Sequence, residues 1–404
     1  MMILRNIVHI AEILVFISLA ASSLYLLVFG IAGVFRYRQA PGGSVHLRKF
    51  AILVPGYKED NVIVETALGS LRLDYPQELY DVYIIADSFR PDTLERLREL
   101  QVRVIEVSFD KSTKAKALNR AMAEITIPYD GVVVLDADNL MAPDFLREVN
   151  DAMARGYSAI QGHRTAKNTD TPFALLDAIS EEINNHIFRK GHRVLGVSSA
   201  LIGSGMAFDY GLYKDFMTRV SAHGEDKELE MQLLGRGITI EYLPEALVYD
   251  EKTRKAEVFA KQRKRWLSAQ FEMFREYGWS GVKQMVTRGN IDLFNKVVQM
   301  ILPPRVLQLG LVTLLLALAV LLHLIPATRE WIVPDPALYL GLWIATAAAI
   351  LLSIPRRYYT FDTLKALKSV PYAFVVMFGV LFRLRGAGSH FIHTPHGTGD
   401  PGKR

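Results

Sequence analysis

Long apolar stretches at the two ends of the chain constrain its fold more than any other feature. Residues 7–35 are apolar except for His9 and Glu12, and residues 306–325 and 336–354 form two further apolar runs. A helix needs roughly 20 apolar residues to cross the hydrocarbon core of a bilayer. The sequence therefore predicts three transmembrane helices, and a purely soluble protein is not expected.

Positive charge after the first apolar run indicates its orientation. Several basic residues lie between positions 36 and 49, whereas Arg5 alone precedes the run. By the positive-inside bias, the part of the chain that follows should be cytoplasmic. A cleaved signal peptide, cut near residues 19–22, is the alternative. The apolar run continues well past that point, and a signal core is only about 7–15 residues long, so an uncleaved anchor is favoured.

Two other stretches are apolar but do not match a membrane span. Residues 370–382 are interrupted by Pro371 and bounded by basic residues, so we expect them to lie in the membrane interface. The alternative is a fourth span, with the tail outside. Residues 292–302 place apolar side chains at helical spacing, which predicts an amphipathic surface helix. The polar residues between them are Asp292, Asn295, Lys296 and Gln299.

The middle of the chain alternates strand-like and helix-like segments from residue 50 to about residue 277. Alternation of this kind predicts a mostly parallel α/β sheet, with ligands bound beyond the carboxyl ends of the strands. The expected strands are 51–54, 82–85, 102–105 and 132–135, and the clearest helices are 91–100 and 114–124.

Composition and patterning together suggest how the chain is divided. The chain has no cysteine, which excludes disulfides, thiolate metal sites and cysteine nucleophiles, and its net charge of +5 is mild. The predicted regions are a transmembrane helix, an α/β domain, amphipathic interface helices, a transmembrane hairpin, and a cytoplasmic interface helix with a tail. Their expected bounds are 1–37, 48–278, 279–305, 306–354 and 355–404.

Acidic residues follow two of the predicted strands. Asp87 ends the second strand, and Asp136 and Asp138 come directly after a fully apolar one. Two carboxylates in an Asp-x-Asp at a strand end can hold a divalent cation and leave positions for diphosphate oxygens. A short acidic loop or a helix cap is the alternative interpretation.

A further acidic pair and a basic, aromatic cluster lie later in the domain. Glu225 and Asp226 precede a helical run, where a carboxylate could simply cap the helix. Residues 262–266, Gln-Arg-Lys-Arg-Trp, could likewise be a solvated helix face. As a site, the arginines would bind phosphate and Trp266 would offer a flat face to a sugar or a base. Together these groups suit transfer from a nucleotide-activated donor.

In these motifs the chain resembles membrane-embedded family-2 glycosyltransferases of the cellulose, chitin and hyaluronan synthase type, which carry a GT-A nucleotide-sugar domain. The motifs occur in the family's order over nearly the whole length. They are Val-Pro-Gly-Tyr-Lys-Glu at 54–59, the segment from Ala86, Lys-Ala-x-x-Leu-Asn at 114–119, Asp-Ala-Asp at 136–138, Gly-Ser-Gly-Met at 203–206, Glu-Asp at 225–226, Gln-x-x-Arg-Trp at 262–266 and a segment similar to the gating loop at 391–397.

The resemblance implies a role for each matching residue. Asp226 is expected to be the catalytic base beside Glu225, and Asp138 with Asp136 is expected to hold Mg²⁺ or Mn²⁺. The donor would be bound by Pro55, Tyr57, Glu59, Asp87, Lys114, Asp136, Gln262 and Arg265. The acceptor would contact Gly203, Ser204, Gly205 and Trp266. The gating loop would use Phe391, Thr394 and His396.

Three departures from the family pattern are visible. Gly224 stands where a threonine is expected before Glu225, and His396 stands where related chains often have lysine. Three spans are also fewer than the large polymer synthases carry, which puts a channel formed by one chain in doubt.

The resemblance implies an inverting, metal-dependent UDP-sugar glycosyltransferase of the plasma membrane, with its catalytic domain and tail cytoplasmic, that extends a β-linked polysaccharide. A single-addition enzyme that glycosylates a membrane lipid is the main alternative, and a non-catalytic sensor of nucleotide sugars is the third. The expected partners are the UDP-sugar, a glycan or lipid acceptor and the bilayer, with accessory export or regulatory proteins compatible with this interpretation. No nucleic-acid partner is expected.

Overall fold

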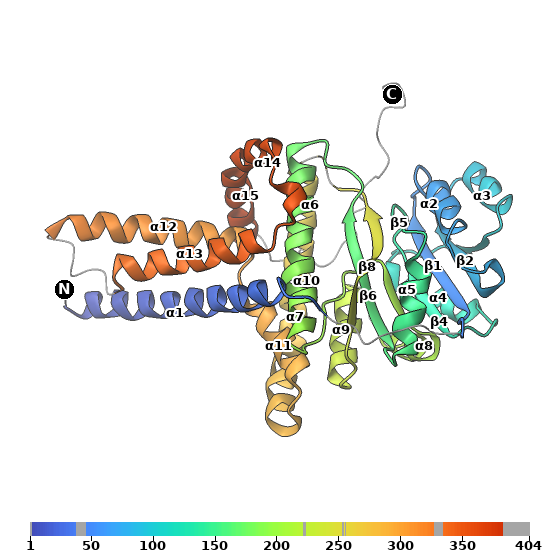
Figure 1. Cartoon of the computed structure of the whole chain (residues 1–404), viewed down its shortest axis with the longest axis horizontal. Coiled ribbons are helices and arrows are strands. Elements are labelled where there is room, and N and C mark those ends of the chain that lie inside the picture. The colour runs from blue at the N-terminus through green and yellow to red at the C-terminus, as the bar shows by residue number, and fades with distance from the viewer. Residues whose placement is uncertain are drawn as a thin grey trace.

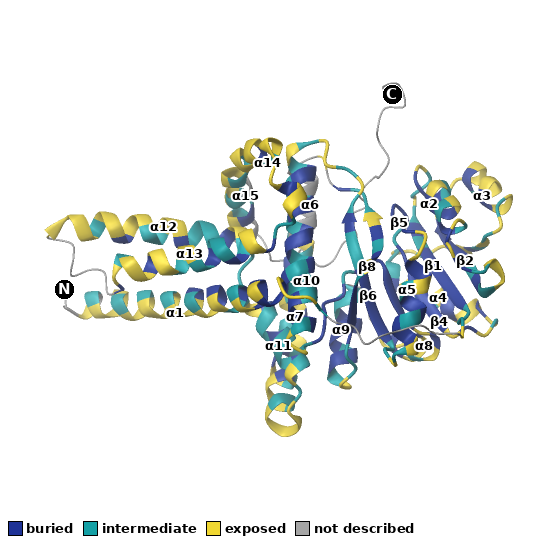
Figure 2. Cartoon of the chain, in the orientation of Figure 1, coloured by how far each residue is buried: buried dark blue, intermediate teal, exposed yellow. Residues whose placement is uncertain are grey.

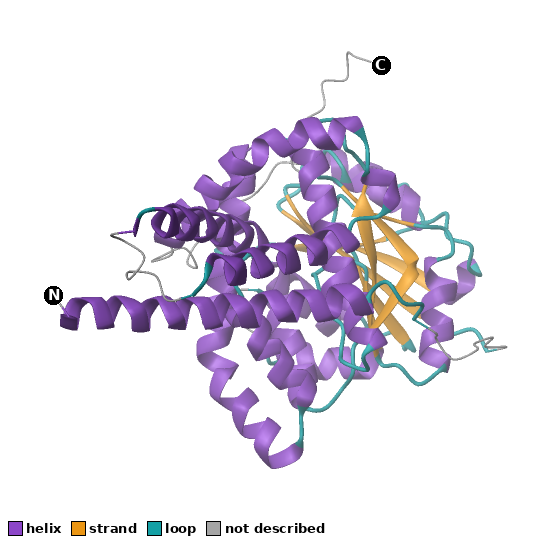
Figure 3. Cartoon of the chain, turned by 60° about the vertical axis from the view of Figure 1, so that its left-hand side comes forward, coloured by secondary structure: helices purple, strands orange, loops and turns teal. Residues whose placement is uncertain are grey.

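Three apolar helices project from one side of an α/β domain (Figure 1). The computed structural model describes residues 2–37, 46–220, 224–252, 254, 256–326 and 334–382. The three helices are α1 (Met2–Ala32), α12 (Arg305–Leu324) and α13 (Pro336–Leu352). They run side by side at one end of the molecule, and the strands gather at the other end when the molecule is turned (Figure 3).

An eight-stranded sheet forms the centre of the α/β domain, in the order β3-β2-β1-β4-β7-β6-β8-β5. The first four strands in this order are parallel, β7 is antiparallel to both of its neighbours, β6 and β8 are parallel, and β5 is antiparallel to β8. The strands are β1 (Phe50–Tyr57), β2 (Tyr80–Asp87), β3 (Arg103–Val107), β4 (Gly131–Val134), β5 (Leu140–Met141), β6 (Ala159–Ala166), β7 (Met206–Asp209) and β8 (Glu241–Asp250).

The strands and helices predicted in the first half of the domain are confirmed with shifts of a few residues. The helices of the chain besides the three apolar ones are α2 (Ile63–Ser70), α3 (Pro91–Arg98), α4 (Lys114–Glu124), α5 (Phe145–Ala154), α6 (Pro172–Asn184), α7 (His192–Val194), α8 (Tyr210–Met217), α9 (Glu225–Gly235), α10 (Ala256–Arg288), α11 (Ile291–Ile301), α14 (Phe361–Ala366) and α15 (Val370–Phe382). Short 3₁₀ or π turns lie at Gln77–Leu79, Asn185–Gly191, Arg356–Tyr358 and Leu367–Ser369.

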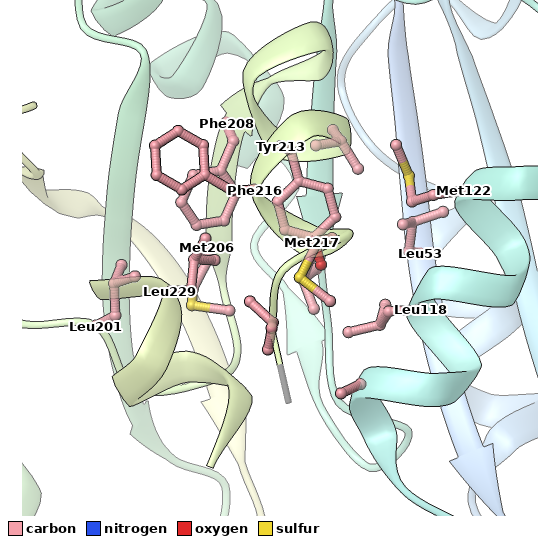
Figure 4. Packing of buried hydrophobic residues seen from close by; sticks show 14 of the residues in the cluster. Leu53, Leu118, Met122, Leu201, Met206, Phe208, Tyr213, Phe216, Met217 and Leu229 are labelled. Carbon is pink, nitrogen blue, oxygen red and sulfur yellow. The ribbon is translucent and has the colours of Figure 1, made fainter. Parts of the chain in front are cut away.

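Apolar packing on both faces of the sheet fixes the helices that carry the candidate site. On one face α4, α8 and α9 pack on β1, β4 and β7 through buried side chains (Figure 4). Leu118 of α4 and Leu229 of α9 belong to this cluster and are almost completely buried. On the other face α2 and α5 cover the sheet. The starts of α4 and α9 are therefore held at fixed places relative to the strand ends.

The apolar helices expose much of their surface (Figure 2). Arg5–Ala32 and Arg305–Leu324 are long and apolar enough to cross a membrane, while Pro336–Leu352 is apolar but has 17 residues. Only 33% and 22% of the most apolar windows of the two longer helices are buried. The core helix of a soluble protein would be mostly buried, so these helices do not resemble one.

Polar contacts link the three apolar helices to one another. Ser22 of α1 donates to Gln308 of α12 (2.6 Å), Gln308 donates to Ser23 (2.9 Å), and Ser23 is 2.8 Å from the hydroxyl of Thr346 in α13. All four side chains are almost completely buried. In an apolar bundle such hydrogen bonds fix which faces of the helices meet.

Two of the shorter predicted segments form helices, but one of them faces the protein differently from the prediction. Residues 370–382 form α15, which packs on α10 and α12 through Leu267 and Leu307. Residues 292–302 correspond to α11, whose four polar side chains are not exposed, while Ile291 and Ile301 are. The predicted helix is therefore present, but its polar side chains bond to the rest of the protein.

Candidate active site

The carboxyl ends of β1 and β2 form the first part of the candidate site. Tyr57 pairs with Asp87 in register, and the Asp87 side chain is buried and accepts a hydrogen bond from Ser88 Oγ (2.9 Å). Lys58 and Ser88, which follow the two strands, have φ angles of 56° and 58°. Positive φ is uncommon and costly for residues other than glycine, and it often occurs at functional sites.

The predicted donor loop begins inside β1. Pro55 and Tyr57 are strand residues, and the carbonyl oxygen of Glu59 accepts hydrogen bonds at the start of α2. A Cβ atom at Gly56 would lie 2.6 Å from Phe89 Cζ, so this glycine lets the ring of Phe89 approach the strand. The backbone of β1 and the Phe89 ring thus meet at the sheet edge beside Asp87.

The Asp-Ala-Asp segment follows β4 and is held by a buried amide. The Asn139 side chain accepts from Ser204 Oγ (2.7 Å), and its nitrogen donates to Asp138 Oδ1 (3.1 Å) and Asp250 Oδ1 (2.9 Å). Ser204 Oγ also accepts from the Asp136 amide (3.0 Å). Asp138, Asn139 and Ser204 are buried. Asn139 thus joins one carboxylate oxygen of Asp138 to Asp250 and Ser204 through hydrogen bonds.

Lys114 brings the scattered acidic residues together. Its Nζ lies 2.5 Å from Asp136 Oδ1, 2.5 Å from the Gly203 carbonyl oxygen and 3.6 Å from Glu225 Oε1. A Cβ atom at Gly203 would lie 3.5 Å from Asp226 Oδ2 and 3.7 Å from Lys114 Nζ. Residues from the starts of α4 and α9, the end of β4 and the loop before β7 therefore converge.

The charges in this cluster depend on one another. Burial alone would lower the pKa of Lys114, but Asp136 and Glu225 raise it above its ordinary value. Burial raises the pKa of Glu225, against the opposing charge of Lys114. Lys114 thus stays a cation and partly offsets the repulsion among three carboxylates.

The loop expected at the acceptor side is tied to the end of β4. The Gly205 amide donates to the Val134 carbonyl oxygen (2.9 Å), and Gly203 and Gly205 have φ angles of 84° and 64°. A Cβ atom at Gly205 would also lie 2.7 Å from a methyl group of Val248. Glycine is needed at Gly205 for both reasons. This loop is tied to β4 by its backbone and faces Asp226 through Gly203.

The glycine that replaces the expected threonine has a structural reason. Gly224 has a φ angle of 72° and precedes α9, where a threonine would be strained. A Cβ atom there would lie 3.5 Å from Ala269 Cβ, so α10 passes close to the start of α9. Arg265 of α10 is exposed and Trp266 is half-buried. The basic, aromatic cluster is therefore on the helix that passes Glu225 and Asp226.

Some predicted site residues lie outside the described part of the chain. The side chain of Gln262 is among them, as are Phe391, Thr394 and His396 of the segment similar to a gating loop. Their proposed roles stay predictions.

The acidic residues suit a divalent cation that is shared with a ligand. Among the described residues, no group of three or more His, Cys, Asp or Glu side chains is arranged to hold a metal ion. Asp136 and Asp138 supply hard oxygen donors, and Mg²⁺ with a nucleotide typically takes only one or two carboxylates from the protein. The donor set therefore fits an ion whose other ligands are phosphate oxygens and water.

Sequence reasoning missed the residues that support Asp138. Lys167 Nζ donates to the Asp138 carbonyl oxygen (2.5 Å), and Lys252 Nζ lies 2.6 Å from Asp250 Oδ2. The position of Asn139 directly after the Asp-Ala-Asp segment was the one available signal. Nothing in the sequence marks Lys167 or Asp250. Asp250 reaches Asn139 because β8 pairs with β5, and Lys167 follows β6, which pairs with the other edge of β8.

Comparison with known proteins gives related enzymes. An N-acetylglucosaminyltransferase of Rhizobium meliloti (strain 1021) is 27% identical over 237 residues, covering 54% of this chain and 55% of the relative. A beta-monoglucosyldiacylglycerol synthase of Synechocystis sp. (strain ATCC 27184 / PCC 6803 / Kazusa) is 25% identical and covers 65% and 56%. A putative cellulose synthase 2 of Komagataeibacter xylinus is 24% identical and covers 63% and 17%. The chain spans about half the length of the first two relatives.

The fold is also found in a solved structure, a mannosyltransferase from Pyrobaculum calidifontis in complex with GDP-Man and Mn²⁺. It is 17% identical, with a TM-score of 0.54, and the match covers 86% of this chain and 99% of that one. The model of glycosyltransferase-like family 2 matches residues 48–269, more than half of the chain. These residues contain the sheet and the converging carboxylates, and the chain belongs to glycosyltransferase-like family 2.

Proposed function

We propose that the protein is an inverting glycosyltransferase that transfers a sugar from a UDP-sugar to an acceptor at the cytoplasmic face of the membrane, with Asp226 as the base. The observation that carries this proposal is the convergence of Asp136, Glu225 and Asp226 on Lys114 beside Gly203. These carboxylates lie at the carboxyl ends of the strands, where open α/β sheets bind ligands. Carboxylates with only a structural role would not be expected to gather at this particular edge.

The donor is expected to bind across the ends of β1, β2 and β4. Asp87 and the strained residues after β1 and β2 would face the uridine, while Lys114 at the start of α4 would reach the diphosphate. A cation in the first helical turn is unfavourable by about 0.3–1 kcal/mol, so its presence there supports an anionic ligand. A Mg²⁺ or Mn²⁺ ion held by Asp136 and Asp138 would neutralise charge on the departing diphosphate.

The acceptor is expected to bind between the Gly203–Gly205 loop and the start of α9. Its hydroxyl oxygen attacks the anomeric carbon, the bond from that carbon to the UDP oxygen breaks, and Asp226 takes the hydroxyl proton. Lys114 and Arg265 would stabilise the negative charge that develops on UDP. Trp266, half-buried on α10, would stack on the acceptor sugar. Attack from the face opposite UDP gives a β-linkage from an α-linked donor.

The apolar helices support a membrane position for this reaction. α1, α12 and α13 run together away from the sheet, and α6, α10 and α11 lie across their direction (Figure 1). By the positive-inside bias, the basic residues that follow α1 support a cytoplasmic position of the catalytic domain. We propose a multi-pass protein of the plasma membrane with its active site beside the cytoplasmic surface.

A growing β-linked polysaccharide is the acceptor that the sequence motifs favour, and a membrane lipid is the second candidate. One observation favours the lipid. Gly30 of α1 lies against Ala349 of α13, and buried hydrogen bonds connect the helices at Ser23 and Gln308. Where these contacts are made the three helices touch one another, so a sugar chain could not pass between them at that level.

Product analysis with a panel of UDP-sugars tests the proposal. The purified full chain in lipid nanodiscs should release UDP with one of the sugars in the presence of Mg²⁺ or Mn²⁺. A ladder of oligomers supports the polysaccharide acceptor, and one added sugar on an extractable lipid supports the alternative. No UDP release with any sugar or acceptor would overturn the proposed function.

Chelation and the substitution Asp138→Ala should have the same effect. EDTA should stop transfer, and Asp138→Ala should lower it by at least about 10²-fold, because the charge that stabilises the leaving group is then lost. Calorimetric titration with UDP and Mn²⁺ should show weakened binding for the variant. Asp144→Ala, an exposed aspartate six residues later, is the matched control. A fully active Asp138→Ala protein would end the metal assignment.

A further inference from the structure

The polar side of α11 connects three parts of the molecule. Asp292 accepts from the Ser198 amide (2.7 Å), and Asn295 accepts from the Tyr25 hydroxyl of α1 (2.8 Å). Gln299 lies 3.1 Å from His192, which is itself 2.9 Å from the Tyr25 hydroxyl. Each of these polar residues contacts another part of the protein, so α11 acts as a connecting element.

The fourth polar residue of α11 forms a buried ion pair with α9. Lys296 Nζ lies 2.6 Å from Glu230 Oε1, and the two side chains are 11% and 2% exposed. Within the described part of the chain, the second carboxylate oxygen of Glu230 has no hydrogen-bond partner. Burial raises the pKa of Glu230 and lowers that of Lys296, and each partner opposes the shift of the other.

A buried ion pair of this kind adds little to stability. Removing two charges from water costs about as much as their attraction returns, and apolar residues of similar volume are often neutral or stabilising in its place. The pair does favour one packing arrangement of α9 and α11 over others, because a shift of either helix would leave a buried charge without its partner. Its use is therefore in fixing a position.

The position that it fixes is that of the proposed base. Glu230 is four residues after Asp226 in α9, so the two side chains lie on the same side of the helix, one turn apart. Lys296 therefore contacts α9 one turn from Asp226. Asn295, the residue before Lys296, contacts Tyr25 of the apolar helix α1. α11 therefore links α1, which it contacts through Asn295, to the helix of the proposed base, which it contacts through Lys296.

We propose that Lys296 and Glu230 are positioning residues that hold Asp226 at a fixed place relative to the membrane helix α1. The inference rests on the proposed role of Asp226 as the base. A misplacement of about 1 Å in a reacting group can cost about 10²-fold in rate. An acceptor that is bound at the membrane reaches the enzyme at a fixed height relative to the bilayer. The base therefore has to be held at a fixed height relative to the membrane helix α1.

The test removes the pair without leaving an unpaired charge. In the variant Glu230→Met/Lys296→Met, the chain should keep its thermal unfolding temperature within a few degrees, because apolar replacement of a buried pair is tolerated. Its kcat should fall about tenfold or more, while KM for the UDP-sugar and the affinity for UDP stay within about twofold, because the donor site is untouched. Lys296→Arg, which keeps the pair, should retain most of kcat.

Two further comparisons separate positioning from a structural role. Lys283→Met removes an exposed charge from α10 and should leave kcat unchanged. Hydrogen–deuterium exchange of residues 225–235 should be faster in the double variant than in the wild type. A stable double variant with wild-type kcat and wild-type exchange would overturn the inference. If the wild type transfers no sugar, the proposed function is contradicted. In that case the exchange measurement by itself tests whether the ion pair holds α9 in place.

Discussion

Asp226→Asn is expected to lower sugar transfer by about 10²–10⁴-fold, the usual contribution of a positioned general base. The amide has nearly the same shape as the carboxylate but cannot accept the proton of the attacking hydroxyl. The Asp226 carboxylate and Lys114 Nζ both lie beside Gly203. Among the described residues, Asp226 forms no hydrogen bond with the ends of β1 and β2, where the uridine is expected to bind. The affinity for UDP should therefore stay within a few-fold. Initial rates of UDP release and a UDP titration measure the two quantities.

Asp209→Asn is the matched control for this substitution. Asp209 also lies at the start of a helix, where it accepts from the Leu212 amide (2.8 Å). It is exposed and lies at the end of β7 opposite to the Gly203–Gly205 loop, in register with Gly131 at the start of β4. Its variant should transfer sugar at the wild-type rate. The assignment of the base is contradicted if Asp226→Asn keeps transfer but loses UDP binding, because Asp226 would then belong to the donor site.

The parallel half of the sheet could be predicted because its signals are local. Each of its strands is a short β-rich run followed by a helical segment, and Asp87 and Asp136 stand where these runs end. The carboxyl ends of parallel strands share one edge, so residue type and position already suggested a common site. The contact of Lys114 with Asp136 agrees with that prediction.

The rest of the site depends on tertiary pairing that no local signal reveals. Asp250 reaches Asn139 only because β8 pairs with β5, and Lys167 reaches Asp138 because β6 pairs with the other edge of β8. The polar side of α11 shows the same limit. Its spacing predicts an amphipathic surface helix, yet Lys296 and Asn295 find partners in α9 and α1. Periodicity identifies a polar face but does not say what covers it.

Lys114→Met is expected to have the second large effect, and it should act on both binding and transfer. The substitution removes the cation that contacts Asp136, Glu225 and the Gly203 carbonyl oxygen while keeping a side chain of similar length. Asp136, Glu225 and Asp226 would then repel one another and the diphosphate. We expect at least about 10²-fold slower transfer, as for the loss of one preorganised electrostatic group, together with weaker UDP binding.

The pKa of Glu225 gives this prediction a second measurement. Burial already raises that pKa, and Lys114 is the main group that opposes the shift, so removal of Lys114 should raise it further. A carboxylate with a raised pKa takes up a proton at a higher pH. The ionised form of Glu225 is then lost at a higher pH. On acidification, the residual activity of Lys114→Met should therefore begin to fall at a higher pH than the activity of the wild type does.

Lys116→Met is the control, two residues later on an exposed part of α4. It should leave the transfer rate, the UDP affinity and the pH profile unchanged. Wild-type UDP affinity in Lys114→Met would mean that the converging carboxylates do not face the diphosphate, and the donor would have to bind elsewhere on the sheet edge.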